Sequence, residues 1–207
     1  MKKLKPILLL LFIIPLCLKS FGQTSAQNKS RFVYNDTLNV RITKLIKSKD
    51  YFKAKKEILK GIDRSKKLND LKSLGVFYTK KGKLELIIER YEDAYKSFKL
   101  AELHSSKIKD YVNLGFVYFN LTLYEIHAKN FGKAIIMLEK SEKNFSKIDK
   151  TFFQDNIILK KIEIPIHQKE YEKSWELLTK FEKEFKRDFS QRSIAKFYYL
   201  QAETAFN

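Results

Sequence analysis

The sequence predicts an all-α protein built from repeated antiparallel helix pairs. Three observations predict this fold class: residue types recur every 40 positions, apolar residues fall three and four apart, and the 207 residues include only 6 Gly and 3 Pro. A fixed period of this length is typical of repeat arrays, and so few helix breakers argue against many short strands. The recurrence is clearest in an aromatic series, Tyr51, Tyr91, Phe131 and Tyr171, and in a small-residue series three positions later, Ala54, Ala94, Ala134 and Ser174.

The first 22 residues have the layout of a secretory signal peptide. Three lysines among the first five residues precede an apolar run over Ile7–Leu18, and Gly22 ends a cleavage site of small residues. The run is too short to span a bilayer comfortably, although an uncleaved anchor is the alternative. We therefore expect an exported chain, periplasmic or secreted, that loses its only cysteine, Cys17, on cleavage near Gly22.

The rest of the chain is expected to be a flexible polar leader over 23–34 and one helical repeat domain over 35–207. Apolar spacing places helices near 36–48, 51–67, 70–88, 91–107, 110–128, 131–147, 150–167, 171–186 and 190–206. Asp70 and Asp110 stand at expected helix starts, where a carboxylate accepts hydrogen bonds from free backbone N–H groups. Pro165 lacks the N–H that would bond to Lys161, so it should kink or end its helix.

Each helix pair needs small residues where the two helices touch and large apolar residues around that contact. The small-residue series supplies these contacts, and Gly75 and Gly115 would allow a second close approach.

These residues resemble the repeat pattern of the tetratricopeptide repeat (TPR) family, although its period is about 34 residues and here it is 40. The repeat that fits best carries Tyr78, Gly82, Tyr91, Ala94, Phe98 and Ala101 at the family's spacing, and the next carries Tyr118, Leu121, Phe131, Ala134, Leu138 and Ser141. The resemblance implies a right-handed α-solenoid of about four repeats, each a first and a second helix, followed by a C-terminal helix.

The formal net charge of +18 would suit a nucleic-acid partner. Nucleic acid is nevertheless disfavoured, because the chain looks exported and its basic residues are mostly lysines interspersed with acidic ones. A solvated helix face explains this pattern, and weak contact with an anionic membrane surface or polyanion is the alternative.

Catalytic chemistry is not indicated. The sequence contains no phosphate-binding glycine loop and no metalloprotease or serine-hydrolase motif, so we expect no enzyme activity, no cofactor and no metal. His127 and His167 lie one repeat apart, without the further ligands that a metal site needs. Glu85 and Glu125 also lie one repeat apart and are expected on a solvated face.

The TPR resemblance implies a concave groove, lined by the first helices, that binds a protein or peptide partner. The lining residues implied are Thr79, Lys83, Phe116, Phe119, Leu123, His127, Asn156, Leu159, Glu163 and His167. Phe116, Phe119 and Leu123 share one face of their helix, so an apolar peptide or helix could lie there unless neighbouring helices cover this face.

The expected C-terminal helix keeps Phe197, Tyr199 and Leu200 in addition to apolar residues in repeat phase. A capping helix should have a polar outer face. Two interpretations remain open: the helix serves as an interface, for instance in self-association, or the array once continued. In the second case the chain would be a truncated periplasmic sensing segment of a signalling or transcriptional regulator, which is the alternative to an interaction scaffold.

Overall fold

The structure, a computed structural model, describes residues 36–148, 153–188 and 190–206, apart from the side chains of 183–188. The expected signal peptide and leader lie outside these residues. Contacts divide the chain into one unit that ends at Asp50 and a second that begins at Tyr51. In the first unit, residues 36–47 form a helix in which Leu38 and Ile42 are buried.

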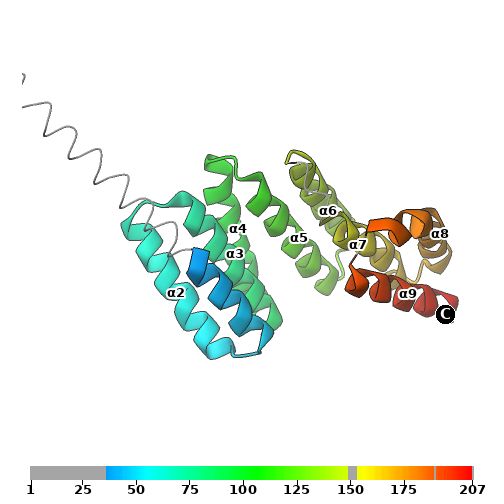
Figure 1. The fold of residues 1–207 in the computed structure, drawn as a ribbon, viewed down its shortest axis with the longest axis horizontal. Coiled ribbons are helices and arrows are strands. Elements are labelled where there is room, and N and C mark those ends of the chain that lie inside the picture. The colour runs from blue at the N-terminus through cyan, green and yellow to red at the C-terminus, as the bar shows by residue number, and fades with distance from the viewer. Residues whose placement is uncertain (1–35, 149–152, 189, 207) are drawn as a thin grey trace, which may run out of the picture. The chain divides into compact units, whose positions relative to one another are not determined.

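The described part of the second unit is all-helical (Figure 1). Its helices are α2 (Tyr51–Lys67), α3 (Leu71–Ile87), α4 (Tyr91–Lys107), α5 (Tyr111–His127), α6 (Phe131–Ser146), α7 (Gln154–His167), α8 (Tyr171–Asp188) and α9 (Gln191–Ala205). Consecutive helices pack on one another, and in addition α3 contacts α5 and α7 contacts α9. The expected all-α fold with packed neighbouring helices is confirmed. No helix in the described ranges is long and apolar enough to cross a membrane.

The small-residue series lies in the core. Ala54, Ala94, Ala134 and Ser174 are all 0% exposed. A small side chain at a buried position lets two helix backbones approach closely. The contact residues predicted from the 40-residue period are therefore confirmed as core positions.

Glycines make room for aromatic rings from the neighbouring helix. A Cβ added to Gly82 would lie 2.6 Å from two ring atoms of Phe98, and one added to Gly61 would lie 2.8 Å from the ring of Phe77. In the repeat after Gly82 and Phe98, the same two positions hold Thr122 and a leucine, both buried. A glycine on one helix is thus paired with a large ring on its neighbour, whereas the larger threonine is paired with a smaller leucine.

Three-residue connections join most of the helices, and all of them have one geometry. The middle residue is in the left-handed region at six positions spaced by multiples of 20 residues: Lys49, Asn69, Glu89, Lys109, Lys129 and Lys169, with φ between 49° and 63°. At Glu89 the backbone N–H donates to the Leu86 carbonyl, and the following N–H, of Arg90, donates to the Glu85 carbonyl. These two bonds satisfy carbonyls that the helix end would leave free. The 40-residue repeat therefore consists of two helix-plus-connection halves of 20 residues.

Capping residues explain where the first helices begin. The Asp70 carboxylate accepts from the Ser73 N–H at 3.2 Å, the Asp110 carboxylate accepts at 3.1 Å from the N–H three residues on, and Ser190 caps α9 in the same way. The equivalent residue before α7 is Lys150, which cannot accept such a bond. As described, α7 begins at Gln154, later in the repeat than its counterparts and later than the sequence predicted. Pro165 lies in its last turn, and the helix ends at His167.

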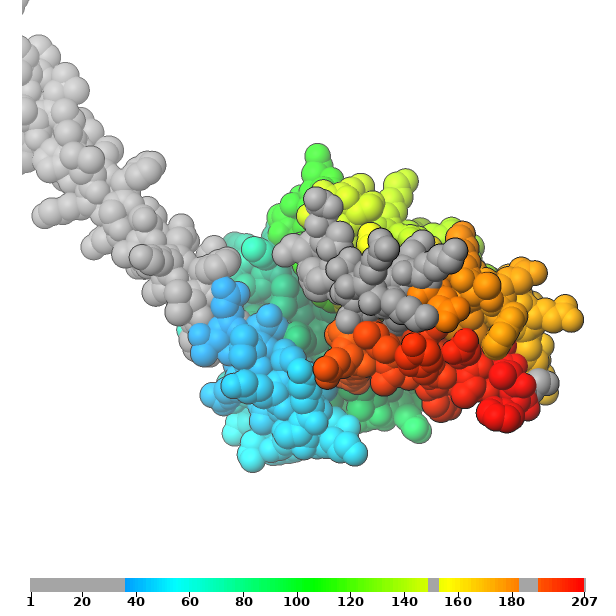
Figure 2. Space-filling view, turned by 45° about the vertical axis from the view of Figure 1, so that its right-hand side comes forward, coloured from blue at the N-terminus to red at the C-terminus, as the bar shows by residue number. Residues whose placement is uncertain are grey.

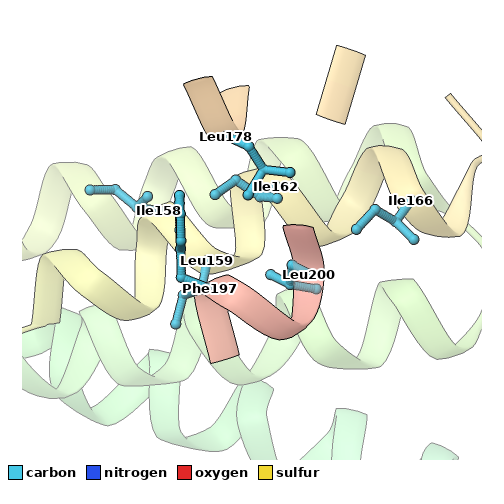
Figure 3. Packing of buried hydrophobic residues seen from close by; sticks show 7 residues of the cluster. All are labelled: Ile158, Leu159, Ile162, Ile166, Leu178, Phe197 and Leu200. Carbon is cyan, nitrogen blue, oxygen red and sulfur yellow. The ribbon is translucent and has the colours of Figure 1, made fainter. Parts of the chain in front are cut away.

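The core of the last three helices is formed by large apolar side chains from each of them (Figure 3). Ile162 of α7 is 0% exposed and lies beside Leu178 of α8, while Leu159 lies beside Phe197 of α9. This packing holds α7 between α8 and α9, as its contacts with both helices also show.

The expectation that Glu85 and Glu125 are solvated is wrong, because both are only 7% exposed. Ser97 donates to the Glu85 carboxylate at 2.6 Å, and the Lys81 ammonium donates to its other oxygen at 2.7 Å. Asn130 donates to the Glu125 carboxylate at 3.1 Å. A buried carboxylate needs such hydrogen-bond partners to offset the free-energy cost of losing its contacts with water. Glu85 and Glu125 are therefore structural residues of the helix packing.

We predict that Lys109→Gly raises the free energy of unfolding by about 0.5–1 kcal/mol, because glycine adopts positive φ without steric cost but is more flexible when unfolded. Urea denaturation measures the change. Lys96→Gly, at an exposed position inside α4, is the matched control and should lower it by about 1 kcal/mol. An equal decrease in the free energy of unfolding in Lys109→Gly and Lys96→Gly would contradict the prediction.

We predict that Gly82→Ala lowers the free energy of unfolding by about 1–3 kcal/mol, because the new Cβ collides with the Phe98 ring. Phe98→Leu should relieve much of this loss, since the following repeat already packs a leucine opposite a larger residue. A double-mutant cycle by urea denaturation measures the coupling. Additive losses would show that the two sites do not interact.

Candidate functional site

The ten expected groove residues come from three first helices, but the structure places them in different environments. Thr79 and Leu159 are 7% exposed, whereas Lys83, His127 and His167 are exposed and the others are half-buried. A residue can bind a partner directly only where its side chain is accessible. The set therefore divides into packing residues and accessible residues.

Thr79 belongs to a buried polar network between α3, α4 and α5. Its hydroxyl lies 3.1 Å from the Asn113 side-chain oxygen, and the Asn113 amide donates to the Ser105 hydroxyl at 2.8 Å. A Cβ on Gly75 would lie 2.4 Å from that hydroxyl, so Gly75 provides the close approach that the sequence predicted. Thr79 ties helices together and is not available to a ligand.

Phe116 and Phe119 are covered by aromatic rings from the same chain. Phe153, just before α7, meets both rings edge-on at centroid distances of 5.0 Å, and Phe145 of α6 meets Phe116 at 5.1 Å. Such pairs add stabilisation beyond their buried area. Neighbouring elements thus partly cover the Phe116 and Phe119 portion of this apolar face, which is the alternative that the sequence left open.

The C-terminal halves of α5 and α7 stay more accessible. Leu123 is half-buried, and one turn later His127 is exposed beside Tyr91 of the previous repeat. The two rings have centroids 5.1 Å apart, and the Tyr91 hydroxyl lies 3.4 Å from Nδ1 of His127. This contact holds the imidazole at the end of its helix.

On α7, Glu163 and His167 occupy the positions that Leu123 and His127 hold on α5. Lys160 donates to one oxygen of the Glu163 carboxylate, and Nε2 of His167 lies 3.6 Å from the other. Burial acts to raise the pKa of Glu163, but Lys160, with Lys196 and His167, outweighs it and leaves the pKa below its usual value. Glu163 is therefore an anion at neutral pH.

The remaining α7 residues of the set are less accessible. Asn156 is half-buried and donates its side-chain amide to the Asp155 carboxylate at 2.7 Å. Leu159 belongs to the core of α7, α8 and α9. Of the ten residues, Lys83, His127 and His167 are exposed, and Leu123 and Glu163 near the two histidines are half-buried.

Sequence reasoning missed Phe153, Tyr91 and Lys160 as neighbours of this surface. Lys150 stands where Asp70, Asp110 and Ser190 stand in the other repeats, and this difference was a visible signal that α7 would not begin like its counterparts. It also missed apolar side chains exposed at one register on three second helices, namely Tyr95, Ile135 and Trp175, which are 40%, 38% and 45% exposed.

In the part of the chain that the structure describes, no group of three or more His, Cys, Asp or Glu residues could hold a metal ion. Comparisons with known protein families, curated proteins and solved structures give no match.

We predict that Phe153→Ala lowers the free energy of unfolding by about 2 kcal/mol, because it removes contacts with Phe116, Phe119 and Phe145. Phe116→Ala should then cost about 0.5–1.5 kcal/mol less in the Phe153→Ala background than in the parent. Urea denaturation of the four proteins measures this. Leu103→Ala, on an exposed α4 position, is the control and should change the free energy of unfolding of the parent protein by less than about 0.5 kcal/mol. A cost of Phe116→Ala that is the same in both backgrounds would contradict the prediction.

Proposed function

We propose that this protein is an exported, non-catalytic interaction scaffold of TPR-like architecture. Its partner is a protein segment, peptide or helix, that lies across the first helices α5 and α7. One observation carries the proposal: at matching repeat positions, both helices present side chains that are not fully buried, namely the half-buried Leu123 and Glu163 and the exposed His127 and His167. A partner that crosses successive repeats would meet equivalent positions at regular intervals.

The solenoid form is itself part of the proposal. It is supported by the contacts of α3 with α5 and of α7 with α9, because in these two cases the first helices of successive repeats lie side by side. It is also supported by the recurrence of one backbone geometry, with a single residue at positive φ, in the three-residue connections between α2 and α6 and between α7 and α8.

The ring of Phe153 on Phe116 and Phe119 limits where a partner can bind. Phe153 lies on Phe116 and Phe119, so a partner reaches the C-terminal halves of these helices more readily than the N-terminal half of α5. Along that region an apolar side chain, Leu123, is followed by the anion Glu163 with its Lys160 neighbour. Such a surface suits an amphipathic segment with a polar side, and the polar groups would select among apolar partners.

We predict that a partner captured from envelope extract binds at least about tenfold more weakly to Leu123→Arg and His127→Glu, since one such loss corresponds to about 1.4 kcal/mol. Leu103→Arg, on the exposed side of α4, is the matched control and should bind normally. Binding is measured by titration calorimetry, with circular dichroism to confirm that each variant is folded.

A partner that binds all three variants equally would overturn the proposed site. A hydrolytic activity that is lost on Glu163→Gln or His167→Ala, with no partner captured, would overturn the proposed function.

A further inference from the structure

The outward face of α9 is largely apolar and exposed, with the Lys196 ammonium 4.6 Å from the centroid of the Tyr199 ring. Tyr198, Tyr199 and Phe206 are 49%, 57% and 89% exposed, and Ala195 and Ala202 beside them are exposed as well. The opposite face is anchored by Phe197 and Leu200, which are buried against α7 and α8. Figure 2 shows α9 in red on the surface of the second unit.

This face differs from the solvent-facing surface of α2. There the exposed aromatic Phe52 has Lys53, Lys55 and Lys56 as its neighbours along the helix, all of them exposed. Lysines there keep apolar side chains from gathering into a patch. A helix face with two tyrosines, a phenylalanine and alanines between them is instead typical of an interface.

The preceding repeats show what covers such a face. Ala195, Tyr198 and Ala202 stand 120 residues after Gly75, Tyr78 and Gly82, which is three repeats. On α3 these positions face α4, and Tyr78 is only 7% exposed there, against 49% for Tyr198. An antiparallel helix would therefore fit on α9 as α4 fits on α3, with a large side chain facing the small residue.

The same face also carries the pattern of a second helix. On α4 the covering residues are Ala94, Phe98 and Ala101, at offsets of zero, four and seven positions. Ala195, Tyr199 and Ala202 have these offsets on α9. One helix therefore has both halves of the small-and-large pattern that joins α3 to α4, and two copies of it are complementary to each other.

We propose that α9 pairs antiparallel with α9 of a second copy of this chain. A twofold axis between positions 200 and 201 sets Ala202 of one copy against Tyr199 of the other, as Gly82 faces Phe98, and Ala195 against Phe206, as Gly75 faces Ser105. A twofold interface uses the same patch on both copies, which a face with both patterns permits.

Charge and size determine how strong this pairing is. The net charge of +18 makes two copies repel, but Ala195, Tyr198 and Ala202 carry no charge, and salt screens the distant charges. One helix pair buries less than the roughly 1,600 Å² of a standard stable interface. The dimer is therefore weak, depends on protein concentration and becomes stronger as salt is added.

Sedimentation equilibrium of the purified chain over a range of concentrations tests the pairing. The average mass should approach twice that of the monomer, and Ala202→Arg and Tyr198→Lys should each shift the midpoint at least about tenfold upward, which is about 1.4 kcal/mol. Both positions are exposed, so the fold should persist, as circular dichroism would verify. Phe52→Lys, which adds the same charge on an exposed aromatic of α2, is the control and should dimerise like the parent.

A chain that stays monomeric at every concentration and salt level overturns the proposal. So does a dimer that Ala202→Arg and Tyr198→Lys leave unchanged. Neither result depends on Leu123 or His127, so failure here is separate from failure of the proposed function.

Disulfide capture tests the orientation. In a Cys17→Ser background, which removes the only natural cysteine, an equal mixture of Ala195→Cys and Phe206→Cys chains should give mainly a mixed disulfide dimer. Two cysteines form a disulfide only when their Cα atoms are within about 7 Å. Cross-linking of Ala195→Cys chains with each other as efficiently as the mixture would indicate a parallel pair and overturn the antiparallel one.

Discussion

Close contact between helices at small residues is the constraint on which the rest of the structure depends. Ala54, Ala94, Ala134 and Ser174 are fully buried, and the glycines that accept Phe77 and Phe98 add further close contacts. When backbones approach this closely, a single added methyl group meets atoms of the neighbouring helix. The chain therefore matches a large residue on one helix with a small one on the next, and this matching is what the 40-residue period records.

The connections convert that local packing into a regular array. Every described three-residue connection places one residue at positive φ and closes the preceding helix with the same two backbone bonds. The next helix then starts from a cap where an aspartate or serine is present. Where Lys150 replaces the cap, α7 begins later, and Phe153 packs on Phe116 and Phe119. A change in one capping residue thus accompanies a change in which aromatic surface is accessible.

The two proposed binding regions follow from the same repeat pattern in different ways. On α5 and α7 the side chains that do not pack against neighbouring helices form an accessible surface of mixed character, around Leu123 and Glu163. On α9 the residues that would normally face a second helix are themselves exposed, as Tyr198 shows. The first region should select a partner by its polar groups, whereas the second should recognise a helix by shape.

The sequence by itself determined the helices, their approximate bounds and the small contact residues. Periodicity, capping residues and the close-approach requirement act within a few residues or recur at a fixed interval, as Asp70 and Ala94 illustrate. Only the tertiary structure decided that Glu85 and Glu125 are buried, that Phe153 covers part of the expected groove and that Tyr198 is open. Burial depends on which side chains other elements bring to a position, and neither helical periodicity nor the repeat register specifies those neighbours.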